Sequence, residues 1–375
     1  MNNVMILKNR TYFSAIIIGT LMMGCTSPAG FKIQGSVDQP LDWKVFLLSE
    51  DKGGDTLAVG KMVNGKFELN GKVEKVALTS LVLEGLPSQL PIYLENSTYQ
   101  ITLDLQNFEK SKIAGGGVSQ QIASAFLEIE QDVAKAIDGI REEYIEAVQE
   151  PEGERFAQLN HFLDSIHQHA ESLKSDLLKK NPNTFFALNQ LAMISSRLSL
   201  EELKAEFDKF DSSLQNSSLG SLVKKQIERM EAVSVGKVMP DFTLQTPNGE
   251  FFTLHSVKGS VKLYDFWASW CSPCRRLVPE LKKLYAEYHS KGLEIVGISM
   301  DDNKTAWKKA IEEEQMQWVQ GSDLKGFKAD NELNKLYNIN NGIPHFVLVD
   351  AQNRILAIGN DFRLIREKLI ESMNN

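Results

Sequence analysis

Cysteine is scarce in this sequence, with 3 among 375 residues. This number excludes a scaffold held together by several disulfide bonds, and a chain of this length can bury hydrophobic cores without them. At about 150 residues per domain, the length predicts two or three domains.

A surplus of positive charge is also missing. The sequence has 41 Lys and Arg residues against 49 Asp and Glu, which gives a formal net charge of −8. Because a positive field is what attracts the phosphate backbone of nucleic acids, we expect no nucleic-acid partner.

No hydrophobic run reaches the roughly 20 apolar residues that a membrane-spanning helix needs. Residues 12–24 are apolar or small, follow two basic residues and end at Gly24-Cys25. This pattern is typical of a signal peptide, and its end resembles the lipobox of bacterial lipoproteins. The resemblance implies that residues 1–24 are removed and that Cys25 carries the lipid anchor. A signal peptide cleaved elsewhere, or a signal anchor, is the alternative.

The rest of the chain divides into three regions by pattern. Residues 25–113 alternate apolar and polar positions, with tight-turn signals at Asn64-Gly65 and Asn70-Gly71, which predicts a small β-sandwich-like domain. Residues 114–236 have apolar residues at helical spacing, which predicts a region of about five amphipathic helices. Residues 237–375 alternate strands and helices, which predicts an α/β domain with a largely parallel sheet. The expected fold class is therefore multidomain.

No metal site is predicted. His161, His167 and His169 lie in the helical region, but they lack the spacing of metal ligands and are interpreted as solvated side chains. No other cofactor is expected.

The most specific motif is Cys271-Ser272-Pro273-Cys274, which follows an apolar strand at residues 261–267 and begins a helix that extends to about residue 288. At a helix N-terminus, free N–H groups and the helix dipole stabilise the thiolate of Cys271 and lower its pKa. Pro273 suits the first helical turn. Cys274 lies on the same face of the helix, within reach of a disulfide bond.

With this motif, residues 237–375 resemble the thioredoxin fold of exported TlpA/ResA-like thiol–disulfide oxidoreductases. The resemblance implies a nucleophilic Cys271 and a resolving Cys274. It also implies a cis Pro344 facing them, with Ile343 offering its backbone to the substrate. The preceding β region resembles the all-β domain of unknown function that often precedes a thioredoxin module in exported lipoproteins.

Two nearby positions bear on proton transfer. Asp265 occupies the position of the buried acid of thioredoxins, where it is expected to exchange a proton with Cys274; a purely structural strand-end carboxylate is the alternative. Many ResA-like proteins instead have Glu three residues after the second Cys, where this sequence has Leu277. Trp270 is a candidate for substrate binding or surface packing, and His345 is expected to be a core histidine.

The resulting hypothesis is a membrane-anchored thiol–disulfide oxidoreductase of the cell envelope, facing the periplasm. Its expected partners are protein disulfide substrates and a membrane electron donor that keeps the dithiol reduced. One alternative is a peroxiredoxin-type enzyme, although the Pro and Thr of that family's cysteine motif are absent before Cys271. The other is a non-enzymatic binding lipoprotein whose β domain recognises a partner.

Overall fold

The computed structural model describes residues 29–374, apart from 51–53, 329–330 and 340–341. These residues form two compact units. The first contains residues up to 192 together with 207–220, and the second contains 193–206 together with 221–374. The predicted signal peptide and Cys25 lie outside the described residues. None of the described helices has both the length and the hydropathy needed to cross a bilayer.

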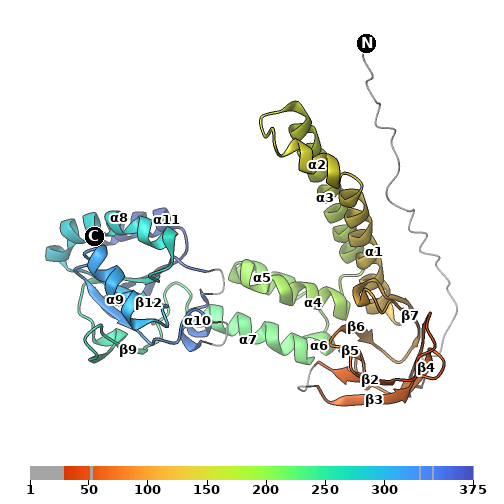
Figure 1. Cartoon of the computed structure of the whole chain (residues 1–375). Coiled ribbons are helices and arrows are strands. Elements are labelled where there is room, and N and C mark those ends of the chain that lie inside the picture. Colours follow the sequence, from red (N-terminus) through yellow and green to blue (C-terminus); the bar gives the residue numbers. More distant parts are fainter. Residues whose placement is uncertain (1–28, 51–53, 329–330, 340–341, 375) are drawn as a thin grey trace, which may run out of the picture. The chain divides into compact units, whose positions relative to one another are not determined.

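The first unit begins with a β-sandwich (Figure 1). Its strands are β1 (Phe31–Val37), β2 (Lys44–Ser49), β3 (Thr56–Lys61), β4 (Lys66–Gly71), β5 (Ala77–Leu83), β6 (Gln89–Leu94), β7 (Thr98–Leu103) and β8 (Lys112–Gly115). They form two four-stranded sheets with the orders β4-β1-β7-β8 and β3-β2-β5-β6. The β1–β7 pair is parallel and the other pairs are antiparallel. Alternate apolar residues fill the space between the sheets.

Of the two predicted turns in the sandwich, the one at Asn64-Gly65 forms and the one at Asn70-Gly71 does not. Asn64 and Gly65 both have positive φ, at 52° and 73°, and they connect to β4 as a tight hairpin turn requires. Asn70 and Gly71 are instead the last residues of β4 and pair with β1. Gly71 is needed there because a Cβ atom would come within 2.5 Å of the ring of Phe31.

Helices follow the sandwich, and the described residues form seven of them where the sequence predicts about five. They are α1 (Val118–Asp138), α2 (Arg141–Ala147), α3 (Glu154–Lys180), α4 (Phe185–Ile194), α5 (Leu200–Phe207), α6 (Ser212–Gln215) and α7 (Ser218–Ala232). Helices α2 and α6 have 7 and 4 residues, which is too short for an apolar period to be recognised. Helices α1 and α3 pack together through Ile129, Ala170 and Leu177.

The second unit contains a seven-stranded sheet. Its elements are β9 (Thr243–Gln245), β10 (Phe251–Thr253), β11 (Val261–Trp267), α8 (Ser272–Tyr288), β12 (Leu293–Ser299), α9 (Lys304–Glu313), β13 (Val319–Ser322), α10 (Glu332–Leu336), β14 (His345–Asp350), β15 (Ile355–Gly359) and α11 (Phe362–Asn374). The strand order is β10-β9-β13-β12-β11-β14-β15. The β11, β12 and β13 strands run parallel, whereas β14 and β15 are antiparallel.

Strand β11 lies inside the sheet, between β12 and β14, and all seven of its residues are buried. Helices surround the sheet, with α8 against β12 and α11 against β14 (Figure 1). A sheet covered by helices buries its inner strands on both faces, which explains why every residue of β11 is buried, Lys262 and Asp265 included. The structure thus confirms the predicted order of an all-β region, a helical region and an α/β domain.

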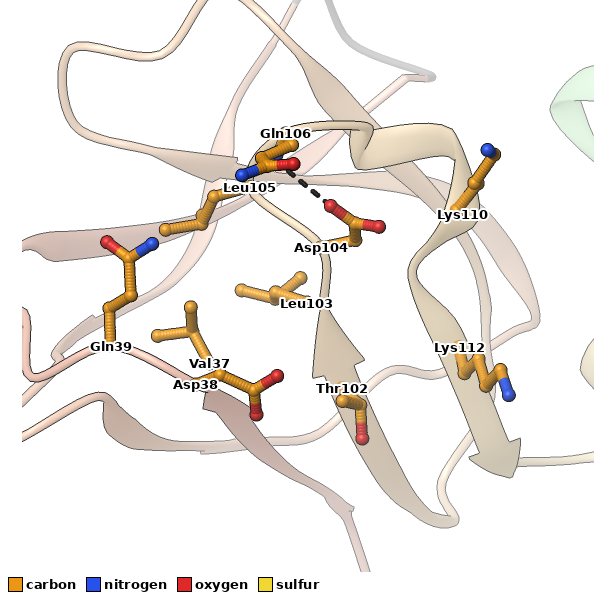
Figure 2. Close-up of a pocket in the computed structure, with 10 residues that line it drawn as sticks. All are labelled: Val37, Asp38, Gln39, Thr102, Leu103, Asp104, Leu105, Gln106, Lys110 and Lys112. Carbon is orange, nitrogen blue, oxygen red and sulfur yellow. Dashed lines mark hydrogen bonds between the residues drawn. The ribbon is translucent and has the colours of Figure 1, made fainter.

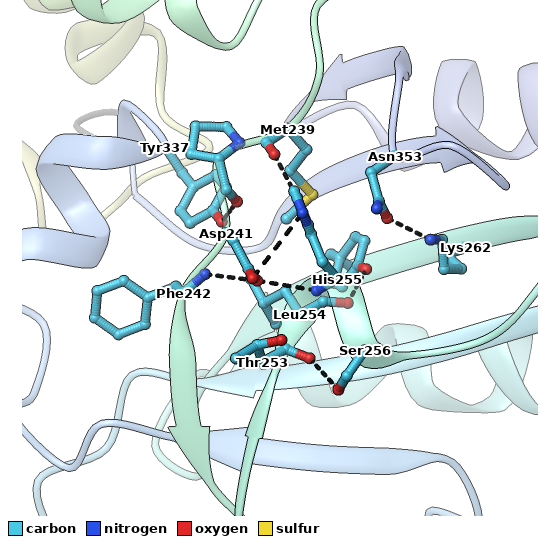
Figure 3. Close-up of polar contacts among 12 residues, drawn as sticks. Met239, Asp241, Phe242, Thr253, Leu254, His255, Ser256, Lys262, Tyr337 and Asn353 are labelled. Carbon is cyan, nitrogen blue, oxygen red and sulfur yellow. Dashed lines mark hydrogen bonds and ion pairs between the residues drawn. The ribbon is translucent and has the colours of Figure 1, made fainter.

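The segment before β9 is tied to the rest of the second unit by polar contacts (Figure 3). Asp241 Oδ1 accepts hydrogen bonds from the backbone N–H groups of Phe242, at 3.0 Å, and His255, at 2.9 Å. The hydroxyl of Tyr337, just after α10, donates to the carbonyl oxygen of Pro240. The Asp241 bond to His255 connects the two ends of the β9–β10 hairpin, and the Tyr337 bond attaches the hairpin to the domain.

Candidate active site

The strand β11 and the helix α8 place the two cysteines. Cys271 is the N-cap residue of α8, and its Sγ atom accepts the backbone N–H of Cys274 at 3.2 Å. The two residues are joined by a disulfide bond, with their Cα atoms 5.3 Å apart. A sulfur at a helix N-cap replaces the usual capping oxygen, and the same N–H would stabilise a thiolate there. The sulfur of Cys271 is therefore held where a negative charge is favoured.

A second segment, far away in the sequence, meets Cys271. The peptide bond between Ile343 and Pro344 is cis. The carbonyl oxygen of Ile343 lies 3.8 Å from Sγ of Cys271. This backbone leads directly into β14, the antiparallel neighbour of β11. The sheet thus brings the Ile343-Pro344 backbone to the end of the strand that carries the CxxC motif.

Asp265 is a buried acid of β11, with 4% of its surface exposed. Its neighbours in the sheet are Gly297 of β12 and Phe346 of β14. Burial in this apolar setting raises the pKa of the carboxyl group to about 7. A group with such a pKa can both accept and release a proton near neutral pH.

Helix α8 has no buried carboxyl group in place of the Glu that many ResA-like proteins have there. Leu277 packs against the core and cannot take part in proton transfer. Glu280 forms an ion pair with Lys283 at 3.4 Å, and about half of its side chain is exposed. Asp265 is therefore the buried carboxyl group that the CxxC strand itself supplies.

An aromatic surface lies beside the cysteines. Trp270 precedes Cys271 and is 58% exposed. Its ring meets that of Phe327 edge to face, with the centroids 6.3 Å apart. A hollow of about 350 Å³ adjoins Trp270, and Arg275 at its wall is paired with Glu313 and Glu314. Exposed aromatic rings of this kind are common in protein-binding surfaces.

Asp301, a buried acid that is not among the residues predicted from the sequence, supports the loop before Cys271. Asp301 follows β12 and accepts hydrogen bonds from both the backbone N–H and the hydroxyl of Ser269, at 2.9 Å and 2.6 Å. Ser299 donates a further bond to it at 2.7 Å. The position of Asp301 after a predicted strand could have identified it, because residues that follow neighbouring parallel strands meet at one edge of the sheet.

The first unit has a hollow of its own, of about 580 Å³, at the ends of β1 and β7 (Figure 2). Its floor includes Val37 and Leu103, and Asp104 and Lys110 lie on its wall. The carboxylate of Asp104 accepts the backbone N–H groups of Gln106 and Asn107, at 3.0 Å and 2.9 Å. Asp104 therefore stabilises the local turn, and none of the predicted catalytic residues lines this hollow.

Comparisons with known proteins agree with the division into an N-terminal β region and a C-terminal α/β domain. Residues 234–366 match the Redoxin family model, and residues 31–121 match a domain of unknown function (DUF4369). The thiol–disulfide oxidoreductase ResA of Bacillus cereus is 26% identical over 136 residues, which cover 36% of this chain and 75% of ResA. ResA of Oceanobacillus iheyensis is 34% identical over 109 residues, which cover 28% of this chain and 54% of that protein.

Solved structures include similar proteins as well. A thiol–disulfide oxidoreductase from Bacteroides fragilis is 33% identical, with a TM-score of 0.33, and the match covers 36% of this chain and 98% of that one. Residues 234–366 thus form a domain of the Redoxin family, and the chain is similar there to TlpA/ResA-like thiol–disulfide oxidoreductases.

Proposed function

We propose that this protein is an extracytoplasmic, lipid-anchored protein disulfide reductase that acts through Cys271 and Cys274. The observation that carries the proposal is the position of Cys271. Its sulfur caps α8, accepts the N–H of Cys274 and lies 3.8 Å from the carbonyl oxygen of Ile343. A substrate segment lying along the Ile343-Pro344 backbone would bring its own disulfide to this sulfur.

The reaction transfers two electrons from the dithiol to the substrate. The thiolate of Cys271 attacks one sulfur of the substrate disulfide, which forms a mixed disulfide and releases the other substrate sulfur as a thiolate. Cys274 then loses its proton and attacks Sγ of Cys271. This step forms the Cys271–Cys274 disulfide and releases the second substrate thiolate. Both substrate thiolates take up protons, and the substrate is left fully reduced.

Asp265 is proposed as the group that accepts the proton of Cys274. Its pKa of about 7 allows it to accept a proton from a thiol and to return it to solvent or substrate near neutral pH. Trp270 and Ile343 are proposed to contact the substrate, Trp270 through its exposed ring and Ile343 through its backbone.

The proposed location follows from the sequence before the described residues. Cys25 would be lipidated after removal of residues 1–24, and the two acyl chains of a diacylglycerol anchor a protein stably. In an oxidising compartment, the dithiol would be reduced again by an electron donor in the membrane. Such a reductant should have a reduction potential nearer thioredoxin, at about −270 mV, than the strong oxidants, at about −120 mV. Equilibration of the protein with glutathione measures it, and a value near the oxidising end would reverse the proposed direction.

Trapping the intermediate tests the mechanism. The reduced Cys274→Ser variant should accumulate a mixed disulfide with insulin, visible as a mass increase on a non-reducing gel. The Cys271→Ser variant should form none, whereas Cys25→Ala, which removes the one other thiol, should reduce insulin like the wild type. A mixed disulfide on Cys274 in the Cys271→Ser variant would overturn the assigned roles.

A further inference from the structure

Asn360 joins the two sides of the Ile343-Pro344 backbone. It directly follows β15, and its side-chain NH₂ group donates to the carbonyl oxygens of Gly342, at 2.8 Å, and Pro344, at 2.6 Å. Ile343, between these two acceptors, is the residue whose carbonyl oxygen lies 3.8 Å from Sγ of Cys271. A single side chain therefore holds the backbone on both sides of the residue that faces the dithiol.

These two bonds determine the orientation of the amide. Carbonyl oxygens only accept hydrogen bonds, so the NH₂ group of Asn360 must face the loop and its Oδ1 atom must face away from it. Oδ1 lies 3.2 Å from Nδ1 of His345. Because Oδ1 only accepts, Nδ1 of His345 must carry the hydrogen.

The side chain of His345 has no second hydrogen bond among the described residues. The residue is 6% exposed and packs edge to face against the ring of Phe266, with the centroids 5.9 Å apart. Its Nε2 atom is buried and has no hydrogen-bond partner among the described residues. Burial lowers the pKa of His345 to about 4, although the bond to Asn360 opposes this shift, so the ring is neutral near pH 7. The Nδ1–H group thus serves to orient Asn360.

We propose that Asn360, oriented by His345, is a positioning residue that holds the Ile343-Pro344 backbone ready to bind an extended segment of a protein disulfide substrate. The proposal rests on the proposed reductase function. Gly342 has a φ of 91°, a conformation that glycine adopts readily and can also leave readily. Without Asn360 this loop would have to be ordered during substrate binding, and that cost would weaken the binding.

Kinetics of the full-length protein test the role of Asn360. In the Asn360→Ala variant, KM for insulin should rise about tenfold, as expected for the loss of two hydrogen bonds. The rate with a small aromatic disulfide, which does not need the loop, should stay within about twofold, and the reduction potential should not change. The isosteric Asn360→Asp variant should behave like Asn360→Ala, because a carboxylate cannot donate to the two carbonyls.

The matched control is Asn303→Ala. Asn303 also makes two hydrogen bonds through its side chain, to the N–H groups of Thr305 and Ala306 at the start of α9. Its variant should keep the wild-type KM for insulin. An unchanged KM in Asn360→Ala, or an equal loss with insulin and the small disulfide, would overturn the proposal.

The tautomer of His345 provides an independent measurement. NMR of the protein labelled with ¹⁵N-histidine should show the Nδ1–H form of His345. The signal is assigned by its absence from a His345→Phe variant. The preference for the Nδ1–H form should be lost in Asn360→Ala. An Nε2–H form in the wild type would contradict the arrangement. If the wild type failed to reduce insulin at all, the reductase proposal would be wrong. The tautomer of His345 would still show whether Asn360 and His345 form their hydrogen bond.

Discussion

At the scale of single residues, Asp265 links protonation to folding. Its pKa of about 7 in the folded protein lies above the ordinary value of 3.8. The folded state therefore binds more protons than the unfolded state between these values, and stability falls as the pH rises from about 4 to about 7. Above pH 7 the loss is complete, because the carboxyl group is then ionised in both states.

The Asp265→Asn variant should escape this loss. The free energy of unfolding of the variant minus that of the wild type should increase by about 4 kcal/mol between pH 4 and pH 8, at 1.36 kcal/mol per pKa unit. Urea unfolding followed by tryptophan fluorescence measures this, since four of the five tryptophans lie in the second unit. The same variant should reduce insulin more slowly. A difference that does not depend on pH would contradict the raised pKa.

The two cysteines should also differ in reactivity. The N–H of Cys274 stabilises a thiolate at Cys271, and Cys271 caps α8 whereas Cys274 lies within it. Alkylation of the reduced protein at mildly acidic pH should therefore label Cys271 first, as peptide mass analysis would show. Equal rates at both cysteines would mean that the helix N-terminus does not distinguish them.

At the scale of elements, α10 and the β9–β10 hairpin are joined by a buried hydroxyl. Tyr337 is fully buried and donates to the carbonyl oxygen of Pro240 (Figure 3). The Tyr337→Phe variant leaves that acceptor without its partner, and the free energy of unfolding should fall by about 1 to 2 kcal/mol.

Urea denaturation of this variant measures the loss. The control is Tyr285→Phe, because the hydroxyl of the half-buried Tyr285 contacts the side chains of His289, at 3.5 Å, and Glu294 instead of a buried backbone carbonyl. That change should stay within about 0.5 kcal/mol of the wild type. Equal effects at both positions would show that the bond to Pro240 contributes nothing of its own.

Local patterns in the sequence determine the ends of some elements but not of others. Helix α3 ends just before Asn181-Pro182 and α6 just before Asn216, because proline and asparagine interrupt helices locally. The Asn70-Gly71 pair did not form its predicted turn. The ring of Phe31 occupies the space beside Gly71, and only the sheet brings these residues together.

At the scale of the whole molecule, the lipid anchor proposed at Cys25 would determine where the enzyme works. If Cys25 carries the lipid, Cys25→Ala should abolish labelling with radioactive palmitate and move the protein to the soluble fraction. The CxxC motif does not include Cys25, so insulin reduction by the released protein should be unchanged. Continued sedimentation with membranes and an unchanged mass would contradict lipidation.

The order of the folded regions was predictable, whereas the assignment of helices to compact units was not. Most of α5 and most of α7 belong to the second unit, and an ion pair between Lys204 and Glu231 joins them there. Helices α1 to α3 and α6 belong to the first unit. An amphipathic pattern shows that a helix buries one face, but it does not show which partner covers that face.

The sequence by itself determined the chemistry that is local. A cysteine at the start of a helix and a second one three residues later share a helix face, so the CxxC motif and its helix follow from short-range spacing. Only the tertiary structure decided what surrounds the motif. Ile343, Asp301 and Asn360 are distant from Cys271 in the chain. They reach the site because β12 and β14 lie on either side of β11 and β15 lies beside β14. Strand order depends on the packing of the complete sheet, which no local pattern records.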